Sequence, residues 1–422
     1  MIDFELPESI QQQVQMMHMV AENMFRPISR EYDEREHEKP MELFNMMWEV
    51  TKAQNAAAIA RARKRATDGD GSAGEKKERR PNMGSMTLVH TIATLAWGDV
   101  GLSLSVPGSG LGGAAIEAAG TPEQKERFLK RFSEGEPKWG AMAITESGAG
   151  SDTSAIKTHA VLDRATNEWV LNGEKIFCTS GWMAGEKSAG FVVVWATVDP
   201  SAGRAGIKSF VVEAGTPGFT VAKLEKKLGI RASDTATLVF QDCRIPYDNL
   251  LGTPDVGEKQ TSEGYKGVLM TFDATRPAVA ASAIGVARAA LDCVKEMLAQ
   301  EGIEIRYDKP RHQLSAVERD VLEMEAQWKA AWLLTQRAAW MNDNRIPNSL
   351  EASMAKAKAG LVVTRITQKA VELLGPLGYS KKYLIEKWFR DAKISDIYEG
   401  TQQINMLIIA RRILGYSSRQ LR

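Results

Sequence analysis

The sequence is poor in the residues that build disulfide frameworks and metal centres. Its three cysteines, Cys178, Cys243 and Cys293, are odd in number and far apart. This usage is typical of reduced thiols in a reducing compartment. The five histidines are scattered singly, and no Cys/His cluster has the spacing of metal ligands. We therefore expect a cytoplasmic protein without a metal site.

The chain also lacks an excess of charge of one sign and a long apolar run. Lysine and arginine number 54 against 53 aspartate and glutamate residues, so no net field favours nucleic acid or an anionic membrane. No run of about 18 apolar residues is present, and no membrane span is expected. The first residues have neither a signal-peptide nor a transit-peptide pattern. An enzyme-sized globular protein remains.

The spacing of apolar residues changes twice along the chain. With 422 residues, two or three domains are expected. Apolar residues have helical spacing before about residue 136, alternate in short runs to about residue 250, and return to helical spacing afterwards. We predict an α+β multidomain fold, with an N-terminal helical bundle (1–136), a central β-barrel or sandwich (137–250) and a C-terminal helical bundle (251–422). The predicted strands are 139–145, 156–162, 168–171, 174–178, 190–198, 208–213, 219–224 and 237–245.

Glycine marks two places where the local structure is open to interpretation. Asn172-Gly173 lies between two predicted strands and indicates a hairpin turn. Residues 108–113 read G-x-G-x-x-G after the strand-like residues 100–106, which formally fits a dinucleotide-binding turn. The second parallel strand that such a site needs is missing. We therefore interpret these glycines as small residues that let helices or a ligand come close.

Residues 61–80 are dense in charge and have no apolar period. One interpretation is a basic patch for an anionic partner. The interpretation that we favour is a solvated loop in the N-terminal domain.

The most suggestive stretch for catalysis is Tyr398-Glu399-Gly400-Thr401, between two helix-like runs. A carboxylate next to a glycine can be approached closely, because glycine has no side chain. The alternatives are a base surrounded by polar groups and an ordinary turn with an exposed glutamate. This stretch alone favours the ordinary turn.

Three other segments carry polar groups that fit a cofactor or an anion. Residues 141–154 and 177–181 form hydroxyl-rich turns that can donate to a cofactor's carbonyl and phosphate oxygens. Asp273 is a predicted N-cap, with Pro277 early in the following helix and Arg276 able to reach an anion. Taken singly, each is more often an ordinary turn or ion pair.

The order of the motifs resembles the acyl-CoA dehydrogenase family over about residues 87–414. The matching stretches are Ile144-Thr-Glu-Ser-Gly-Ala-Gly-Ser-Asp152, Leu171-Asn-Gly-Glu-Lys-Ile-Phe-Cys-Thr179, Thr275-Arg-Pro277, Arg390-Asp-Ala-Lys-Ile394 and Ile397-Tyr-Glu-Gly-Thr401. The resemblance implies the helical–β–helical fold of that family and FAD bound between the β domain and the C-terminal helices. It also implies an acyl-CoA substrate, a homotetramer, and an electron-transferring flavoprotein as electron acceptor.

The resemblance also implies a role for individual residues. Glu399 takes the place of the catalytic base of short- and medium-chain members; relatives with the base on an earlier helix have no counterpart here, because Ala274-Thr275 offers no carboxylate. The cofactor-binding residues would be Met142, Ile144, Thr145, Phe177, Cys178, Thr179, Thr401 and Gln403. The substrate-binding residues would be Ser151, Asp273, Thr275, Arg276 and Gly400.

The implied reaction removes a proton α to the thioester and a hydride from the β carbon. Burial raises a glutamate pKa from about 4.3 towards neutrality and improves its match to a carbon acid. The enolate-like oxygen would be stabilised by the backbone N–H of the base and a flavin hydroxyl. The flavin accepts the hydride at N5.

Two motifs depart from the family pattern. Residues 302–313 keep His312-Gln313, but Arg306 is differently spaced from the family's arginine and no Phe-Gly follows. The family's Gln-x-x-Gly-Gly reads Glu372-Leu-Leu-Gly-Pro376. Both place contacts between one subunit and its neighbour's FAD in doubt, and leave a tetramer, a dimer or a heteromer open.

Four activities therefore compete. The first is an acyl-CoA dehydrogenase; the others are an enoyl-CoA reductase, an acyl-CoA oxidase and a non-catalytic subunit of a heteromeric dehydrogenase. The acyl group is not determined, although residues 102–111 are expected to border its tail and contain no Arg or Lys.

Overall fold

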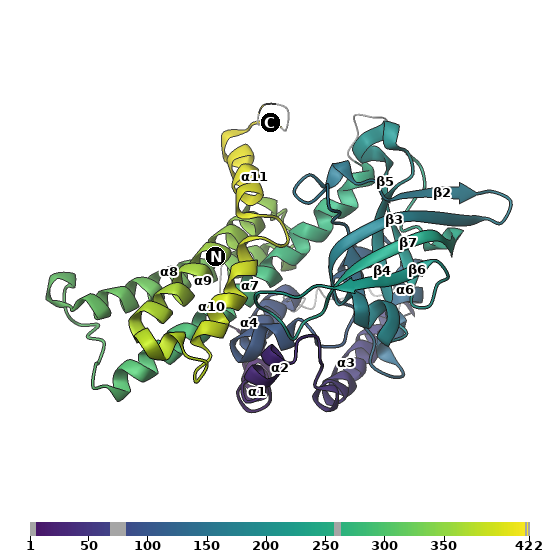
Figure 1. The fold of residues 1–422 in the computed structure, drawn as a ribbon. Coiled ribbons are helices and arrows are strands. Elements are labelled where there is room, and N and C mark those ends of the chain that lie inside the picture. The colour runs from purple at the N-terminus through teal and green to yellow at the C-terminus, as the bar shows by residue number, and fades with distance from the viewer. Residues whose placement is uncertain (1–5, 68–81, 257–262, 418–419, 421–422) are drawn as a thin grey trace, which may run out of the picture.

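Helices fill both ends of the chain and strands fill its middle (Figure 1). The computed structural model describes residues 6–67, 82–256, 263–417 and 420. The N-terminal part contains α1 (Glu8–Val20), η1 (Ala21–Phe25), α2 (Ser29–Glu34), α3 (Met41–Thr67), α4 (Gly84–Ser103), α5 (Gly110–Ala119), α6 (Pro122–Leu129) and η2 (Lys130–Ser133). The C-terminal part contains α7 (Glu263–Gln300), η7 (Arg311–Gln313), α8 (Ala316–Asp343), α9 (Ser349–Tyr379), α10 (Ile385–Ala392), η8 (Lys393–Asp396) and α11 (Gln402–Leu414).

The middle part is one seven-stranded sheet. Its strands are β1 (Gly140–Ala143), β2 (His159–Asp163), β3 (Glu168–Thr179), β4 (Phe191–Thr197), β5 (Ile207–Glu213), β6 (Phe219–Leu224) and β7 (Thr235–Pro246), with the short helices η3 (Thr153–Ala155), η4 (Met183–Lys187), η5 (Pro200–Gly206) and η6 (Tyr247–Asn249) between them. The strand order is β1-β4-β2-β3-β7-β6, and β5 pairs with β4. β1 runs parallel to β4, whereas β3, β6 and β7 pair antiparallel.

Both faces of the sheet are covered by apolar side chains at its centre. All seven residues of β4 are buried. Val192 and Val194 pack in one apolar cluster, while Val193 and Trp195 pack in another. Because successive side chains of a strand point to opposite faces, β4 divides two cores. The sheet is therefore a rigid platform for the loops at its edges.

The order of helical, strand and helical segments is confirmed, and four local predictions are wrong. Residues 168–171 and 174–178 are not joined by a hairpin turn, because β3 runs through both. The register shifts between Leu171 and Gly173, so these residues form a bulge. The Asn172 side chain accepts from the Asp242 backbone N–H at 2.8 Å and thereby replaces a missing ladder contact.

Of the strand-like residues 100–106, residues 100–103 instead finish helix α4, and residues 104–106 lie after its end. Asp99 is non-helical, with φ −161° and ψ 121°, and its Oδ1 accepts from the Leu102 N–H at 2.8 Å. An aspartate that caps the next turn in this way restarts the helix. After this turn the G-x-G-x-x-G stretch opens α5, where a Cβ on Gly112 would lie 2.5 Å from the Ala141 carbonyl oxygen. Close packing, and not nucleotide binding, explains that glycine.

Asp273 is not an N-cap, because α7 begins at Glu263 and contains Pro277 in its interior. Residues 61–67 of the charged stretch belong to α3, so they are not a loop. The remaining residues of that stretch, 68–80, lie outside the described part of the chain.

Helix α7 is the central helix of the C-terminal bundle. Its segment Met270–Gln300 is long and apolar enough to cross a membrane by length and composition, but its most apolar 18-residue window is 72% buried inside the protein. Its side chains Ala283, Ala287 and Leu291 belong to the main apolar cluster of the bundle. The apolar composition is thus accounted for by packing against neighbouring helices.

A buried ion network joins the N-terminal and C-terminal helices behind the site. Lys387 Nζ lies 2.7 Å from Asp99 Oδ2 and 2.6 Å from Asp391 Oδ2. Asp391 also accepts from the Ile230 backbone N–H, which ties α10 to the segment before β7. This network fixes the helix that leads to residues 397–401.

Candidate active site

The turn that contains Glu399 has an unusual backbone. Glu399 has φ +57° and Gly400 has φ +94°. A non-glycine residue rarely adopts a positive φ, and residues held there at a cost gather at functional sites. The turn carries the chain from η8 into α11 (Figure 1).

The Glu399 carboxylate points into the protein. Its Oε2 accepts a hydrogen bond of 2.9 Å from the Thr275 hydroxyl on α7. Burial raises the pKa of this carboxyl, while the Thr275 hydrogen bond and the charges of Arg276 and Lys356 pull it down. Part of the residue surface remains open to solvent. An exposed turn glutamate would have neither a raised pKa nor a buried partner, so the geometry favours the base over the ordinary turn.

The Gly400 carbonyl oxygen receives two side-chain donors. Asn405 Nδ2 donates to it at 2.8 Å, and Lys356 Nζ on α9 also donates to it. A Cβ on Gly400 would lie 3.1 Å from Asn405 Nδ2. Glycine is therefore needed at position 400 both for its φ and for this close approach.

The α7 residues predicted to contact substrate lie on the same side of the site. Arg276 is 5% exposed, and its Nη1 lies 3.1 Å from Asp273 Oδ1 and 3.4 Å from Ser353 Oγ. Burial raises the pKa of Asp273, and Arg276 opposes that rise. The structure thus brings Thr275, Arg276 and Gly400 to Glu399, whereas Ser151 lies in an exposed loop before η3.

Residues of β3 hold the loop after β1 in place. Ile144 is buried and its carbonyl accepts from Lys175 Nζ at 3.1 Å, while the Thr145 carbonyl accepts from the Ile176 N–H at 2.9 Å. Met142 is buried in an apolar cluster of the sheet. The fully buried Lys175 ammonium also lies 2.7 Å from Glu146 Oε1. These contacts hold the backbone of residues 144–145 at the sheet edge.

The end of β3 presents an aromatic ring to solvent. Phe177 is 60% exposed and has φ +58°. The neighbouring Cys178 is buried, and burial raises the pKa of its thiol. Thr179 ends the strand and is half-buried. The following turn is held by Asp234, whose Oδ2 accepts from the Trp182 N–H at 3.0 Å.

The residues at the start of α11 offer hydrogen-bonding groups. Thr401 Oγ1 accepts from the Ile404 N–H at 3.3 Å and caps the helix, and Gln403 is exposed in its first turn. Gln402 Oε1 is buried without a hydrogen-bond partner in the described part of the chain. The N-terminus of a helix favours anions such as phosphate.

These features fit a flavin nucleotide. The exposed Phe177 ring provides an apolar face for a planar ring, and the buried Gln402 oxygen lacks a donor that a ligand hydroxyl can supply. The residues that would hold FAD are therefore the predicted set: the backbone at Ile144 and Thr145, the β3 end at Phe177 and Thr179, and the α11 start.

Sequence reasoning missed the groups that hold the site from behind. Lys356, Asn405 and Lys175 are each at most 1% exposed. In the sequence, Lys356 and Lys358 are two similar lysines in an alanine-rich run. A helical wheel places them on different faces, but only the contacts of α9 show which one is buried beside the turn.

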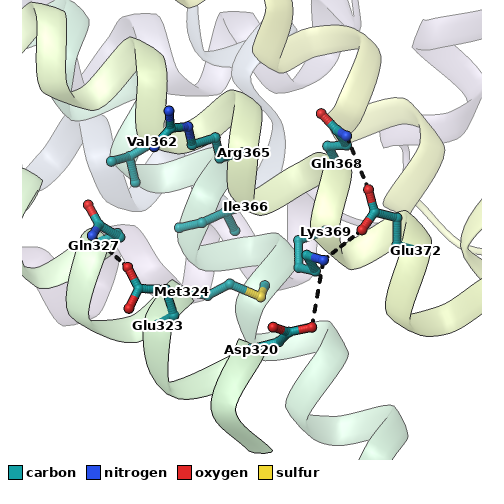
Figure 2. A pocket seen from close by; sticks show the side chains of 10 residues that line it. All are labelled: Asp320, Glu323, Met324, Gln327, Val362, Arg365, Ile366, Gln368, Lys369 and Glu372. Atoms are coloured by element: carbon teal, nitrogen blue, oxygen red, sulfur yellow. Dashed lines mark hydrogen bonds and ion pairs between the residues drawn. The ribbon is translucent and has the colours of Figure 1, made fainter. Parts of the chain in front are cut away.

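In the two motifs that depart from the family pattern, the charged side chains Arg306 and Glu372 have ion-pair partners within this chain. Arg306 Nη2 lies 2.7 Å from Glu318 Oε2 and its Nε donates to Glu318 Oε1 at 2.7 Å. Figure 2 shows the side chains that line a surface hollow between α8 and α9, with Glu372 paired with Lys369. The hollow has a volume of about 320 Å³, and the ion pair is 2.7 Å long. Its lining residues do not include Glu399, so this hollow is separate from the candidate active site.

Comparison with known proteins agrees with this geometry. Residues 141–243 match the acyl-CoA dehydrogenase middle domain, and residues 262–414 match the acyl-CoA dehydrogenase C-terminal domain. The chain is 35% identical over 421 residues to the acryloyl-CoA reductase (NADH) of Anaerotignum propionicum, covering 98% of this chain and 96% of the relative. It is 41% identical over 295 residues to the mitochondrial short-chain specific acyl-CoA dehydrogenase of Bos taurus, covering 70% of this chain and 67% of the relative.

A solved structure extends the likeness over the whole fold. The butyryl-CoA dehydrogenase from Megasphaera elsdenii aligns with a TM-score of 0.81 and 31% identity, covering 98% of this chain and 100% of that chain. The chain therefore belongs to the acyl-CoA dehydrogenase family, whose members are flavoproteins that act on acyl-CoA thioesters.

Proposed function

We propose that this protein dehydrogenates an acyl-CoA thioester to the 2-enoyl-CoA, with Glu399 as the base that removes the α proton. The observation that carries the proposal is the inward-pointing Glu399 carboxylate, whose pKa is raised by burial and which accepts one hydrogen bond from Thr275. A carboxyl with a raised pKa is a stronger base and matches the weak acidity of a thioester α proton better. Bound FAD supplies the acceptor for the β hydride at N5.

The other residues orient the reactants. Thr275 fixes the direction of the carboxylate, and Arg276 supplies a buried cation next to the substrate side of α7. The two side chains that donate to the Gly400 carbonyl hold the turn that carries the proposed base in one place. Such positioning is a large part of enzymatic rate enhancement. We also propose that Met142 and Cys178 belong to the cofactor site and that Ser151 belongs to the substrate site.

The substitution Glu399→Gln tests this proposal. The amide keeps the size of the side chain but cannot take a proton, so we expect turnover to fall by roughly 10³-fold. The purified variant should keep its flavin absorbance. Glu174→Gln, an exposed glutamate on β3, is the control and should retain full turnover. A Glu399→Gln variant with near-normal rates would remove Glu399 as the base.

The reverse reaction is the second candidate. The similarity to an acryloyl-CoA reductase over nearly the whole chain favours it, because the same base returns the proton when an enoyl-CoA is reduced. Rates measured in both directions, with an artificial electron acceptor and with a reduced donor, distinguish the two. Peroxide formed in air would identify an oxidase, and purified protein without flavin absorbance would identify a non-catalytic subunit.

Two further proposals follow from family membership. The electron acceptor is an electron-transferring flavoprotein, and the protein assembles as a homotetramer. A cytoplasmic location is a separate proposal, and the three free cysteines support it. The domain limits 1–136, 137–250 and 251–422 remain predictions.

Rates with a panel of short, branched, cyclic and aromatic acyl-CoA thioesters would identify the acyl group.

A further inference from the structure

A buried lysine lies directly behind the catalytic turn. Lys356 of α9 is 1% exposed, and its Nζ donates to the Gly400 carbonyl oxygen. Its neighbours Ser353, Ala355 and Ala357 are also buried. A lysine ammonium is almost never buried to this extent without a partner, because desolvation of the charge is costly.

The lysine contact helps to offset the free-energy cost of the positive φ at Glu399. Glu399 and Gly400 both have positive φ, and in this turn the Gly400 carbonyl accepts from Lys356 on α9 and from the Asn405 side-chain amide. A positive φ at a glutamate costs free energy that the surrounding contacts must offset. Lys356 and Asn405 together fix the peptide bond between Gly400 and Thr401, which begins one residue after Glu399.

The lysine also contributes charge to the site. The charged groups that face it come from three elements: Arg276 from α7, Asp396 from η8 and Glu399 from the turn. Burial lowers the pKa of Lys356 to about 8, and the two carboxylates raise it. At neutral pH the ammonium is therefore charged, and its field favours the ionised form of Glu399.

We propose that Lys356 is a positioning residue for the reaction: its ammonium holds the Gly400 carbonyl, and thereby the direction of the Glu399 carboxylate, and supplies a positive charge beside that base. The inference rests on the proposed function, in which Glu399 removes the α proton. It assigns to Lys356 no contact with substrate or flavin.

Two substitutions separate the hydrogen bond from the charge. Lys356→Gln keeps a donor without the charge, whereas Lys356→Met removes both. Lys358→Met is the matched control, because Lys358 is two positions away on the same helix and donates to Gln327 instead. Each variant is compared with the wild-type holoenzyme for kcat, KM, the flavin-to-protein ratio, and the pH dependence of kcat/KM.

We expect Lys356→Met to lower kcat by about 10- to 100-fold with a much smaller change in KM. The acidic limb of its kcat/KM profile should move to higher pH by about one unit, because a nearby positive charge no longer lowers the Glu399 pKa. Lys356→Gln should show the same shift of the limb with a smaller loss of kcat. Lys358→Met should behave as the wild type.

Other outcomes overturn the inference in distinguishable ways. If both Lys356 variants keep the wild-type acidic limb and lose rate only in proportion to lost flavin, Lys356 has a structural role alone. If Lys356→Met does not fold, an unshifted limb in Lys356→Gln decides against the proposal. If Glu399→Gln is fully active, the proposed base and this inference fail together, whereas loss of turnover in Glu399→Gln with normal Lys356 variants contradicts the inference alone.

Discussion

Glu146 and Glu399 each lie near a different buried lysine, and the two carboxyl groups have different hydrogen-bond partners. Glu146 at the sheet edge accepts from Lys175 Nζ at 2.7 Å and from the backbone N–H groups of Lys157 and Thr158 at 2.6 and 3.0 Å. Despite the burial of this carboxyl, those donors lower its pKa. Among the residues that the structure describes, Thr275 donates a hydrogen bond to Glu399, and burial raises the pKa of this glutamate.

The difference shows that the number of hydrogen-bond donors around a buried carboxylate affects its proton affinity. A carboxylate that is surrounded by donors is stabilised in its charged form and becomes a poor base. A carboxylate with one donor in a buried site keeps a high proton affinity. In addition, Lys175 bonds the Glu146 carboxylate directly, whereas Lys356 bonds the carbonyl oxygen of Gly400, the residue after Glu399. The first lysine pairs with the carboxylate itself, and the second leaves the Glu399 carboxylate free for the proposed proton transfer.

The largest effect on stability should follow from breaking the structural pair. Glu146→Gln leaves the fully buried Lys175 ammonium without its counter-ion, and we expect the free energy of unfolding to fall by about 3 kcal/mol. Urea unfolding of the holoenzyme measures this change. Glu174→Gln next to Lys175 is the exposed control and should differ from the wild type by less than about 0.5 kcal/mol. Equal stability of the two variants would contradict the anchoring role of Glu146.

A smaller effect should follow from removing the single donor of the base. Thr275→Val preserves the shape of the side chain and removes the hydroxyl that binds Glu399. The Glu399 pKa should then rise further, which moves the acidic limb of kcat/KM upward by about one unit and lowers the rate at pH 7 by about tenfold. The control is Thr271→Val one turn earlier on α7, where the hydroxyl donates to the Gly267 carbonyl. An identical pH profile for both variants would show that Thr275 does not act on the base.

The smallest effect concerns the stability of the Glu399→Gln variant. Because the folded-state pKa of Glu399 is raised, the folded protein retains a proton that the unfolded chain releases, and the wild type loses stability as the pH rises through this window. Glutamine does not titrate. We expect the variant to be more stable than the wild type by about 1 kcal/mol at pH 7.5, and this gain to shrink towards pH 4.5. Urea midpoints at the two pH values give the comparison, and a gain that is larger at low pH would reverse the sign assigned to burial.

The order of the elements was predictable because it depends on local pattern. Strand β6 spans the predicted residues 219–224, since alternating residues between turn signals leave little choice. The errors occurred where a distant contact overrides that pattern. The glycine after Asn172 forms a bulge because β3 continues along β7. Residues 100–103 are helical because Asp99 caps the turn that follows it.

The sequence by itself determined which chemical groups are present and the order in which they follow one another. It was sufficient to single out Glu399, Thr275 and Arg276 and to indicate the family. The tertiary structure decided which carboxyl group has its pKa raised by burial and which one is held in its charged form by several donors. The pKa of a carboxyl depends on its burial and on the donors around it, and those donors come from elsewhere in the chain: Thr275 is 124 residues from Glu399. Only the fold brings α7, α9 and the turn before α11 together, and so only the fold separates Lys356 from Lys358 and Glu399 from Glu146.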